Sequence, residues 1–232
     1  MKARRVKKLD PRAALAENAA RIVRVRLEEL RSFAPDALDP ESSAVQHDMR
    51  IAAKRLRYVL EATGFCFGRA GTTARRRTKD LQDLLGEVHD ADVMLPRLSE
   101  HRAMLRAGDA AAVRDRAGQA GDLDPELAAR APHRTTYRGF EVLEVYLIAR
   151  RSLLFERFIA LWEESEEKGV WQALDRAAER ELERVAQLRR IAERAERARA
   201  ALLDAERMRH EAEERTSSAA AELAAAERAG TS

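Results

Sequence analysis

The chain has 232 residues, of which 36% are charged and 5% aromatic, and it contains ten glycines and six prolines. A composition so poor in glycine and rich in alanine, arginine, glutamate and leucine is typical of long helices and argues against sandwiches and barrels, which need frequent turns. The single cysteine, Cys66, excludes a disulfide framework and a cysteine-based zinc site. No apolar run approaches the roughly 20 residues that cross a bilayer, and none follows the basic first residues as a secretion signal would. We therefore expect a cytoplasmic protein without a membrane segment.

Positive charge is concentrated in the first third of the chain. Residues 1–79 contain 19 Lys and Arg against 9 Asp and Glu, a net charge of +10. Residues 80–232 contain 24 against 31, a net charge of −7. Basic surface helices also occur without a ligand, but this segregation favours a polyanionic partner for the first third.

Helical spacing of apolar residues and cap signals predict four helices in the first half of the chain. Asp10-Pro11 and Asp39-Pro40 each have the pattern of an N-cap followed by proline at the first helical position. The expected helices cover residues 10–33, 40–62, 72–85 and 90–106. Four helices joined by short connections predict an antiparallel four-helix bundle.

The boundary between the third and fourth helices is expected at Gly86. Asp90 is then a natural N-cap for the fourth helix, and this structural role is favoured over a role in chemistry. Pro96 is expected to be tolerated in the first turns of the fourth helix or to kink it.

Three further segments follow this basic unit of residues 1–106. Glycines and prolines punctuate residues 107–136, which predicts a linker with short helical pieces. Residues 137–168 form a strong helical pattern with an aromatic stripe, which either completes the bundle or makes a dimer contact. Residues 169–232 predict a long helical arm rich in Ala, Glu and Arg with a frayed end, and a folded-back arm and a coiled coil fit it equally well. The fold class is therefore all-α.

The segment from Gln46 to Glu61 separates into two faces on a helical wheel. One face is a core stripe of Met49, Ala52, Ala53, Leu56, Val59 and Leu60. The opposite face carries His47, Arg50, Lys54, Arg57, Tyr58 and Glu61. Arg55 lies between the two faces.

The cations on this second face recur about once per turn, so their charges are spaced roughly 5.4 Å apart along the helix and could follow successive phosphates. Tyr58 and His47 add hydrogen-bonding groups without a permanent charge. A solvated surface is the alternative interpretation, but such surfaces usually intersperse acids with cations, and here only Glu61 does so. The next helix adds a second basic row, Arg75, Arg76 and Lys79.

Signals of catalysis are missing from the sequence. No nucleophile has a nearby base, no glycine-rich loop could hold phosphates, and no histidine pair has metal-ligand spacing. We therefore expect neither catalytic residues nor a metal site nor a cofactor, and a binding protein rather than an enzyme.

Two motifs resemble those of the CHAD family, the conserved histidine α-helical domains. They are His47-x-x-Arg50-x-x-x-Lys54-Arg55-x-Arg57-Tyr58-x-Leu60-Glu61 and Leu81-Gln-x-x-Leu-Gly86-x-x-His89-Asp90-x-Asp92. The resemblance covers about residues 10–106. It implies a helical fold, binding of inorganic polyphosphate, association with polyphosphate granules, and a triphosphate-tunnel (CYTH) enzyme as a partner. It assigns ligand contacts to His47, Arg50, Lys54, Arg55 and Arg57, with Arg75, Arg76 and Lys79 as the second basic row, and the second motif adds His89.

The chain departs from the family pattern because it has one recognisable repeat instead of two. No second basic motif follows Lys79, and Arg150-Arg151 is the nearest basic pair. A homodimer that joins two basic columns would compensate for the missing repeat. We expect a non-catalytic, polyphosphate-binding helical module, and the alternatives are a nucleic-acid binder and a helical scaffold or adaptor.

Overall fold

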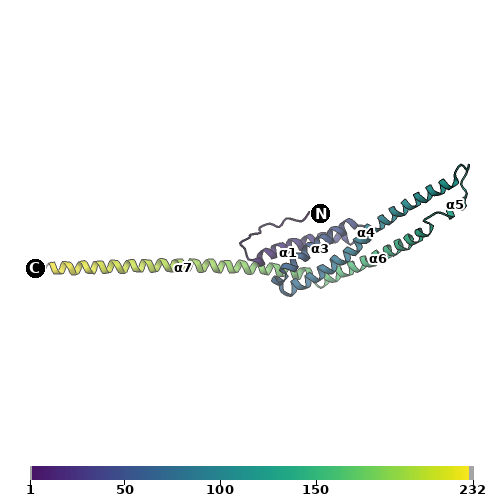
Figure 1. The fold of residues 1–232 in the computed structure, drawn as a ribbon. Coiled ribbons are helices and arrows are strands. Elements are labelled where there is room, and N and C mark those ends of the chain that lie inside the picture. The colour runs from purple at the N-terminus through teal and green to yellow at the C-terminus, as the bar shows by residue number, and fades with distance from the viewer. Residues whose placement is uncertain (1, 230–232) are drawn as a thin grey trace. The chain divides into compact units, whose positions relative to one another are not determined.

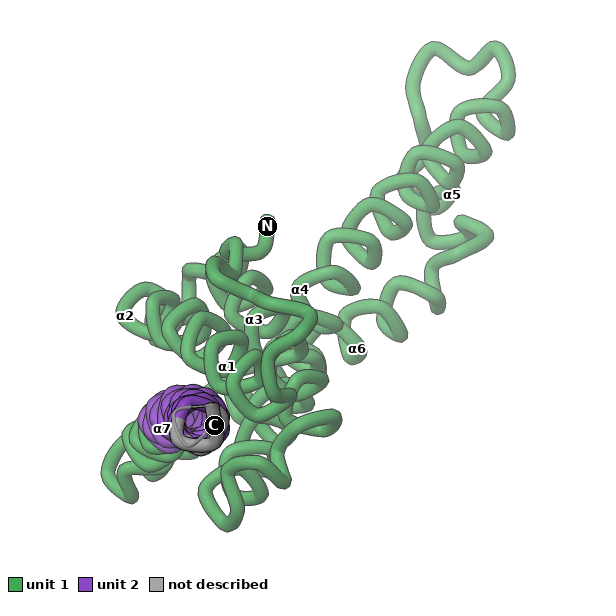
Figure 2. Tube along the Cα trace, turned by 90° about the vertical axis from the view of Figure 1, so that its left-hand side faces the viewer, with its two compact units in different colours: residues 1–181 green, residues 182–232 purple. Residues whose placement is uncertain are grey.

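The computed structural model describes residues 2–229, and this part of the chain is all-α, with helices and no strand. In chain order the elements are α1 (Leu15–Arg31), α2 (Ala34–Ala37), α3 (Ser43–Thr63), the 3₁₀ helix η1 (Gly64–Phe67), α4 (Gly68–Ala117), α5 (Pro125–Ala129), α6 (Arg134–Glu167) and α7 (Val170–Ala229). The chain divides into two compact units, Met1–Glu181 and Leu182–Ser232, drawn in green and purple in Figure 2. Within residues 2–229, no helix has both the length and the apolar character needed to cross a membrane.

The core of the first unit forms where α1, α3, α4, α6 and the first turns of α7 bring their apolar side chains together (Figure 1). The stripe predicted on α3 is confirmed at five of its six positions: Met49, Leu56 and Leu60 are fully buried, as are Ala52 and Ala53, whereas Val59 is partly exposed. Removing such side chains from water contributes roughly 1.5–3 kcal/mol each. The buried side chains of the other helices include Val23, Leu27 and Leu30 of α1, Leu81, Leu85 and Val88 of α4, and Phe158 and Trp162 of α6.

Helix α4 is one continuous helix of 50 residues, so the expected break at Gly86 is wrong. The predicted third and fourth helices are two parts of α4, and Asp90 lies inside it instead of at an N-cap. Arg50 of α3 packs over this position: a Cβ at Gly86 would make an ordinary van der Waals contact with Nε of Arg50, at 3.5 Å. An interior glycine costs a helix about 1 kcal/mol relative to alanine, which packing along α3 and α6 readily offsets. Pro96 is likewise accommodated inside α4.

The helix starts expected at Asp10 and Asp39 come several residues later in the structure. Each aspartate instead closes a turn with its own side chain. Oδ1 of Asp10 accepts a hydrogen bond from the backbone N–H of Arg12 at 2.9 Å, and Oδ1 of Asp39 accepts one from Glu41 at 3.0 Å. Aspartate carboxylates that bind the backbone two residues later are typical of Asx turns, which explains why a cap signal and a turn signal look alike in sequence.

The segment expected to be a linker, residues 107–136, contains the last turns of α4, the short helix α5 and the start of α6. Here α4 and α6 lie side by side and α5 lies near the end of the pair (Figures 1 and 2). The buried carboxylate of Asp109 on α4 fastens this end. It accepts hydrogen bonds from the backbone N–H of His133 at 3.2 Å and from the hydroxyl of Tyr137 at 2.5 Å, and it contacts Nδ1 of His133 at 2.8 Å.

Ion pairs hold α6 antiparallel to α4 along its length. They join Arg77 to Glu164 and Arg102 to Glu144, at 2.8 and 2.6 Å, and also Glu87 to Arg150 and Asp92 to Arg151. Both members of the Arg150-Arg151 pair are therefore bound to acids of α4. Nη2 of Arg151 also donates to the backbone oxygen of Pro40 at 3.0 Å. These arginines position α6 and do not replace the second basic motif that the sequence lacks.

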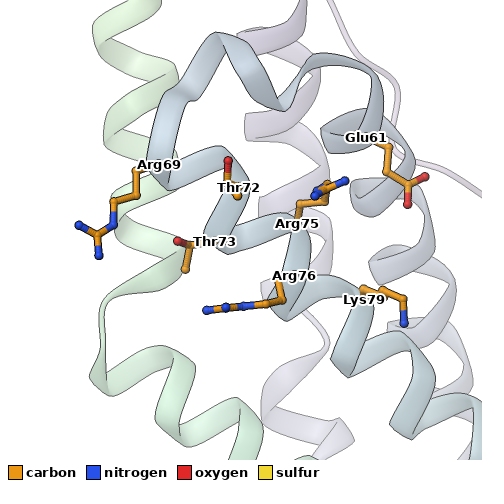
Figure 3. Close-up of a pocket in the computed structure, with 7 residues that line it drawn as sticks. All are labelled: Glu61, Arg69, Thr72, Thr73, Arg75, Arg76 and Lys79. Atoms are coloured by element: carbon orange, nitrogen blue, oxygen red, sulfur yellow. The ribbon is translucent and has the colours of Figure 1, made fainter.

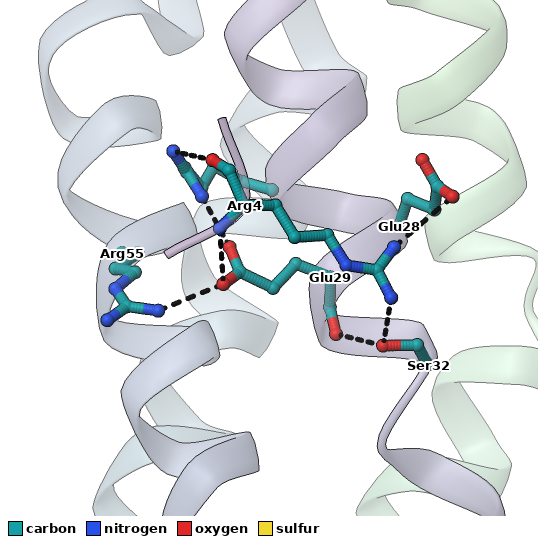
Figure 4. Close-up of polar contacts among 6 residues, drawn as sticks. Arg4, Glu28, Glu29, Ser32 and Arg55 are labelled. Atoms are coloured by element: carbon teal, nitrogen blue, oxygen red, sulfur yellow. Dashed lines mark hydrogen bonds and ion pairs between the residues drawn. The ribbon is translucent and has the colours of Figure 1, made fainter. Parts of the chain in front are cut away.

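A buried carboxylate, Glu29 of α1, links α1, α3 and the N-terminal segment (Figure 4). Its side chain is 1% exposed. Oε1 accepts hydrogen bonds from Nη1 of Arg55 at 2.9 Å and from the backbone N–H of Arg4 at 3.2 Å, and Oε2 accepts one from Nη1 of Arg26 at 2.5 Å. Because burying an unpaired charge is costly, these partners make the position of Glu29 tolerable and fix the side chain of Arg55 on α1.

Glu29→Ala is expected to lower the free energy of unfolding by about 3 kcal/mol, because it leaves two partly buried guanidinium groups without their carboxylate. Denaturant unfolding followed by circular dichroism measures this change. Glu28→Ala is the matched control, since Glu28 is 74% exposed and its pair with Arg4 is worth less than about 1 kcal/mol. Equal losses in the two variants would contradict the role assigned to Glu29.

Candidate functional site

Helices α3 and α4 run antiparallel, and their register brings the two basic rows of the sequence together. At one end, the rings of His47 and His89 lie 4.3 Å apart between centroids. Farther along, Arg50 lies against Gly86. Next, the charges of Arg57 and Lys79 are close enough to repel each other.

Glu61 and Arg75 line one pocket at the other end, near the connection between the two helices. Residues farther along α3 thus lie beside residues nearer the start of α4. We call this strip of surface the seam. It comprises His47, Arg50, Lys54, Arg57, Tyr58 and Glu61 of α3, with Arg75, Lys79, Gln82, Gly86 and His89 of α4.

The α3 side of the seam carries cations that are largely free of acidic partners. In the part of the chain that the structure describes, Arg50 and Lys54 form no ion pair. Arg57 approaches Glu61, with 3.3 Å between Nε and Oε1, but without the geometry of a hydrogen bond. The half-exposed ring of Tyr58 lies beneath Lys54 Nζ and Arg57 Cζ, at 5.7 and 5.0 Å from its centroid. Cation–π attraction therefore holds these cations over the same ring.

The α4 side of the seam borders a surface pocket of about 460 Å³ near the start of the helix (Figure 3). The exposed guanidinium groups of Arg75 and Arg76 line it, and neither has an acidic partner among residues 2–229. Lys79 also lines it but is bound to Asp83, with 2.6 Å between Nζ and Oδ2, and this hydrogen bond raises the pKa of Lys79. Like charges gathered around one pocket repel one another, so this cluster is unfavourable unless an anion lies nearby.

The pocket has lining residues that the sequence did not single out, namely Arg69, Thr72 and Thr73. Together with Arg76 they recur at intervals of three, four and seven residues, which places them on one face of α4. The helical spacing of these residues was missed because the third helix was expected to begin at residue 72, whereas α4 begins at Gly68.

The histidine pair belongs to the same surface. His47 and His89 are half-buried, and Nδ1 of His47 is buried without a hydrogen-bond partner in the described structure. Burial lowers the pKa of His47, and the charges of His89 and Arg50 lower it further. The imidazole of His47 is therefore neutral near pH 7 and can donate one hydrogen bond and accept another.

Four buried polar atoms along the seam have no hydrogen-bond partner within the described residues. They are Nδ1 of His47, Nε of Arg50, Nε of Arg57 and Oε1 of Gln82. Buried polar groups nearly always have partners, so a cluster of orphaned ones along one strip calls for an explanation, such as ordered water or a ligand. Three of the four are nitrogen atoms next to positive charge, which suits an anion.

Arg55 differs from the other candidates because it does not join the seam. Its guanidinium is bound to the buried carboxylate of Glu29. Of the ten residues predicted for ligand binding, Arg55 thus belongs to the buried network around Glu29 and not to the seam. The seam and its pocket contain the others: His47, Arg50, Lys54, Arg57, Tyr58, Arg75, Arg76, Lys79 and His89.

Comparison with known families finds one match. Residues 2–99 match the family model described as the CHAD domain, and this range includes both sequence motifs and the whole seam. Neither the curated proteins nor the solved structures contain a match to the chain. Among the described residues, no group of three or more His, Cys, Asp or Glu side chains is arranged to hold a metal ion.

His89→Asn is expected to raise the pKa of His47 toward its ordinary value of 6.5, because it removes a neighbouring positive charge. An NMR titration of the His47 ring protons measures the shift, and an unchanged or lower pKa would contradict the proximity of the two rings.

The lowered pKa of His47 also determines how stability changes with pH. The unfolded chain binds the His47 proton first as the pH falls, so this residue makes the free energy of unfolding decrease below about pH 6.5.

Proposed function

The chain carries one recognisable CHAD region, residues 2–99, and from this premise we propose that the protein binds inorganic polyphosphate along the seam without catalysing a reaction. The CHAD domain is associated with polyphosphate binding in general. The observation that carries the proposal is the register of α3 on α4, which aligns two rows of cations whose neighbours supply few acids. Arg50, Lys54, Arg75 and Arg76 have no acidic partner in residues 2–229.

The dimensions of the seam suit a linear polyanion. From His47 to Glu61 it follows about four turns of α3, a length of roughly 20 Å. Arginine fits phosphate with paired hydrogen bonds, and lysine contributes a compact charge. A flexible chain can therefore contact several cations in succession. Each contact releases counterions, so affinity should rise with chain length and fall with salt.

Inorganic polyphosphate fits this surface better than a nucleic acid does. Proteins that hold single-stranded nucleic acid usually offer aromatic rings on which the bases stack. The rings of the seam are already engaged: Tyr58 by Lys54 and Arg57, and His47 and His89 by each other. The seam thus offers charge without a stacking platform.

The few acids of the seam also suit binding better than catalysis. Glu61 approaches Arg57, and Asp83 beside the seam is bound to Lys79. Magnesium-dependent phosphate chemistry uses carboxylates that are free to coordinate the ion, and these two are engaged by cations. Association with polyphosphate granules and with a triphosphate-tunnel enzyme would follow from the same proposal.

The double variant Arg50→Ala/Lys54→Ala is expected to weaken polyphosphate binding at least about tenfold, since it removes two charged contacts. It should also lower the slope of log affinity against log salt by about two. Fluorescence anisotropy at several salt concentrations measures both quantities. Circular dichroism should show unchanged helicity, because neither side chain lies in the core stripe of α3.

Arg114→Ala/Arg138→Ala is the matched control, because it also removes two positive charges, here from exposed positions of α4 and α6 outside the CHAD region. It should leave the salt slope near the wild-type value. Equal losses in the two double variants would mean that net charge, and not the seam, determines binding. Displacement of polyphosphate by RNA at equal phosphate concentration would favour the nucleic-acid alternative.

A further inference from the structure

The pocket at the start of α4 differs from the rest of the seam in its density of positive charge. Three arginines, Arg69, Arg75 and Arg76, line it, and none has an acidic partner in the described part of the chain. Elsewhere the cations of the seam follow one another about one turn apart. In Figure 3, Arg69 and Arg76 extend to one side of α4, while Arg75 lies on the side of Glu61.

The hydroxyl of Thr73 adds a hydrogen-bond donor to the same pocket. The neighbouring hydroxyl of Thr72 already donates its proton to the backbone oxygen of Gly68, at 3.3 Å. Thr73 has no side-chain partner within residues 2–229 and is free to donate to a ligand. The pocket volume of about 460 Å³ is ample for a compact anion. Positive charge, hydrogen-bond donors and a pocket thus occur together at one end of the seam.

The two ends of a polyphosphate chain differ chemically from its interior. An interior phosphate has two non-bridging oxygens that share one negative charge. A terminal phosphate has three non-bridging oxygens and, with a second ionisation near neutral pH, a charge approaching −2, as in a phosphate monoester. Several guanidinium groups around one pocket favour the group with more charge and more acceptors.

We propose that the pocket lined by Arg69, Arg75 and Arg76 binds the terminal phosphate group of the polyphosphate chain, an inference that rests on the proposed function. The seam leads directly to it, because Arg75 and Lys79 belong to both. A chain lying along α3 and α4 therefore places its end in the pocket. The site recognises chain ends as well as chain length.

The test compares two polyphosphates of the same defined length, each long enough to span the seam. One has free ends, and in the other both terminal phosphates are capped as alkyl phosphoramidates, which removes one ionisable oxygen from each end. Fluorescence anisotropy competition gives both affinities. The wild-type protein is expected to bind the free-ended chain about tenfold more tightly, since it loses a charge-assisted hydrogen bond with the capped chain.

Arg69→Ala/Arg76→Ala is expected to abolish this preference by weakening binding of the free-ended chain, with little change for the capped chain. Arg50→Ala/Lys54→Ala is the matched control: it should weaken both chains alike and keep the preference. Circular dichroism of both variants checks their folding.

Three outcomes would overturn the assignment of the pocket. Equal binding of the two chains by the wild-type protein would show that chain ends are not recognised, while polyphosphate binding itself would stand. A preference that persists in Arg69→Ala/Arg76→Ala would place end recognition elsewhere. If neither chain binds the wild-type protein, the proposed function fails together with this inference.

Discussion

The antiparallel register of α3 against α4 is the constraint on which the candidate site depends. The buried stripe of α3 fixes its rotation, and Arg50 packs against α4 at Gly86. A slip of one or two residues would turn the cations of one helix away from those of the other, because successive residues point in directions about 100° apart. Packing of the core therefore determines the electrostatics of the surface. His47 meets His89 for the same reason.

Ion pairs divide the arginines of this chain into two groups. Arg55 is bound by a buried acid of α1, and Arg77 and Arg151 by acids that join α4 to α6. These pairs fix the helices relative to one another, and their charge is already balanced. Arg50 and Arg76, in contrast, have no acid within reach among the described residues. Because like charges raise the free energy of the folded state, the second group is best explained by an anionic ligand.

Much of the fold could be predicted because helical periodicity is local information. The core stripe of α3 and the extent of α6 were both legible in the sequence. The error at Gly86 has a tertiary cause, since the packing of α4 along α3 and α6 outweighs the usual cost of a glycine inside a helix. The rows of the site were also legible from residue spacing. Residue spacing did not show which arginines are neutralised by acids, because Glu29 lies 26 residues from Arg55 and only folding brings them together.

In the proposed complex, phosphates lie against the cations of the seam that no acid neutralises. The most direct measurement is an NMR spectrum of the arginine Nε–Hε groups, recorded with and without polyphosphate and assigned by single Arg→Lys variants. Binding is expected to shift the resonances of Arg50, Arg75 and Arg76, while those of Arg26, Arg55 and Arg151, which are bound to acids, remain in place. Shifts confined to the acid-bound arginines, or spread evenly over all arginines, would contradict it.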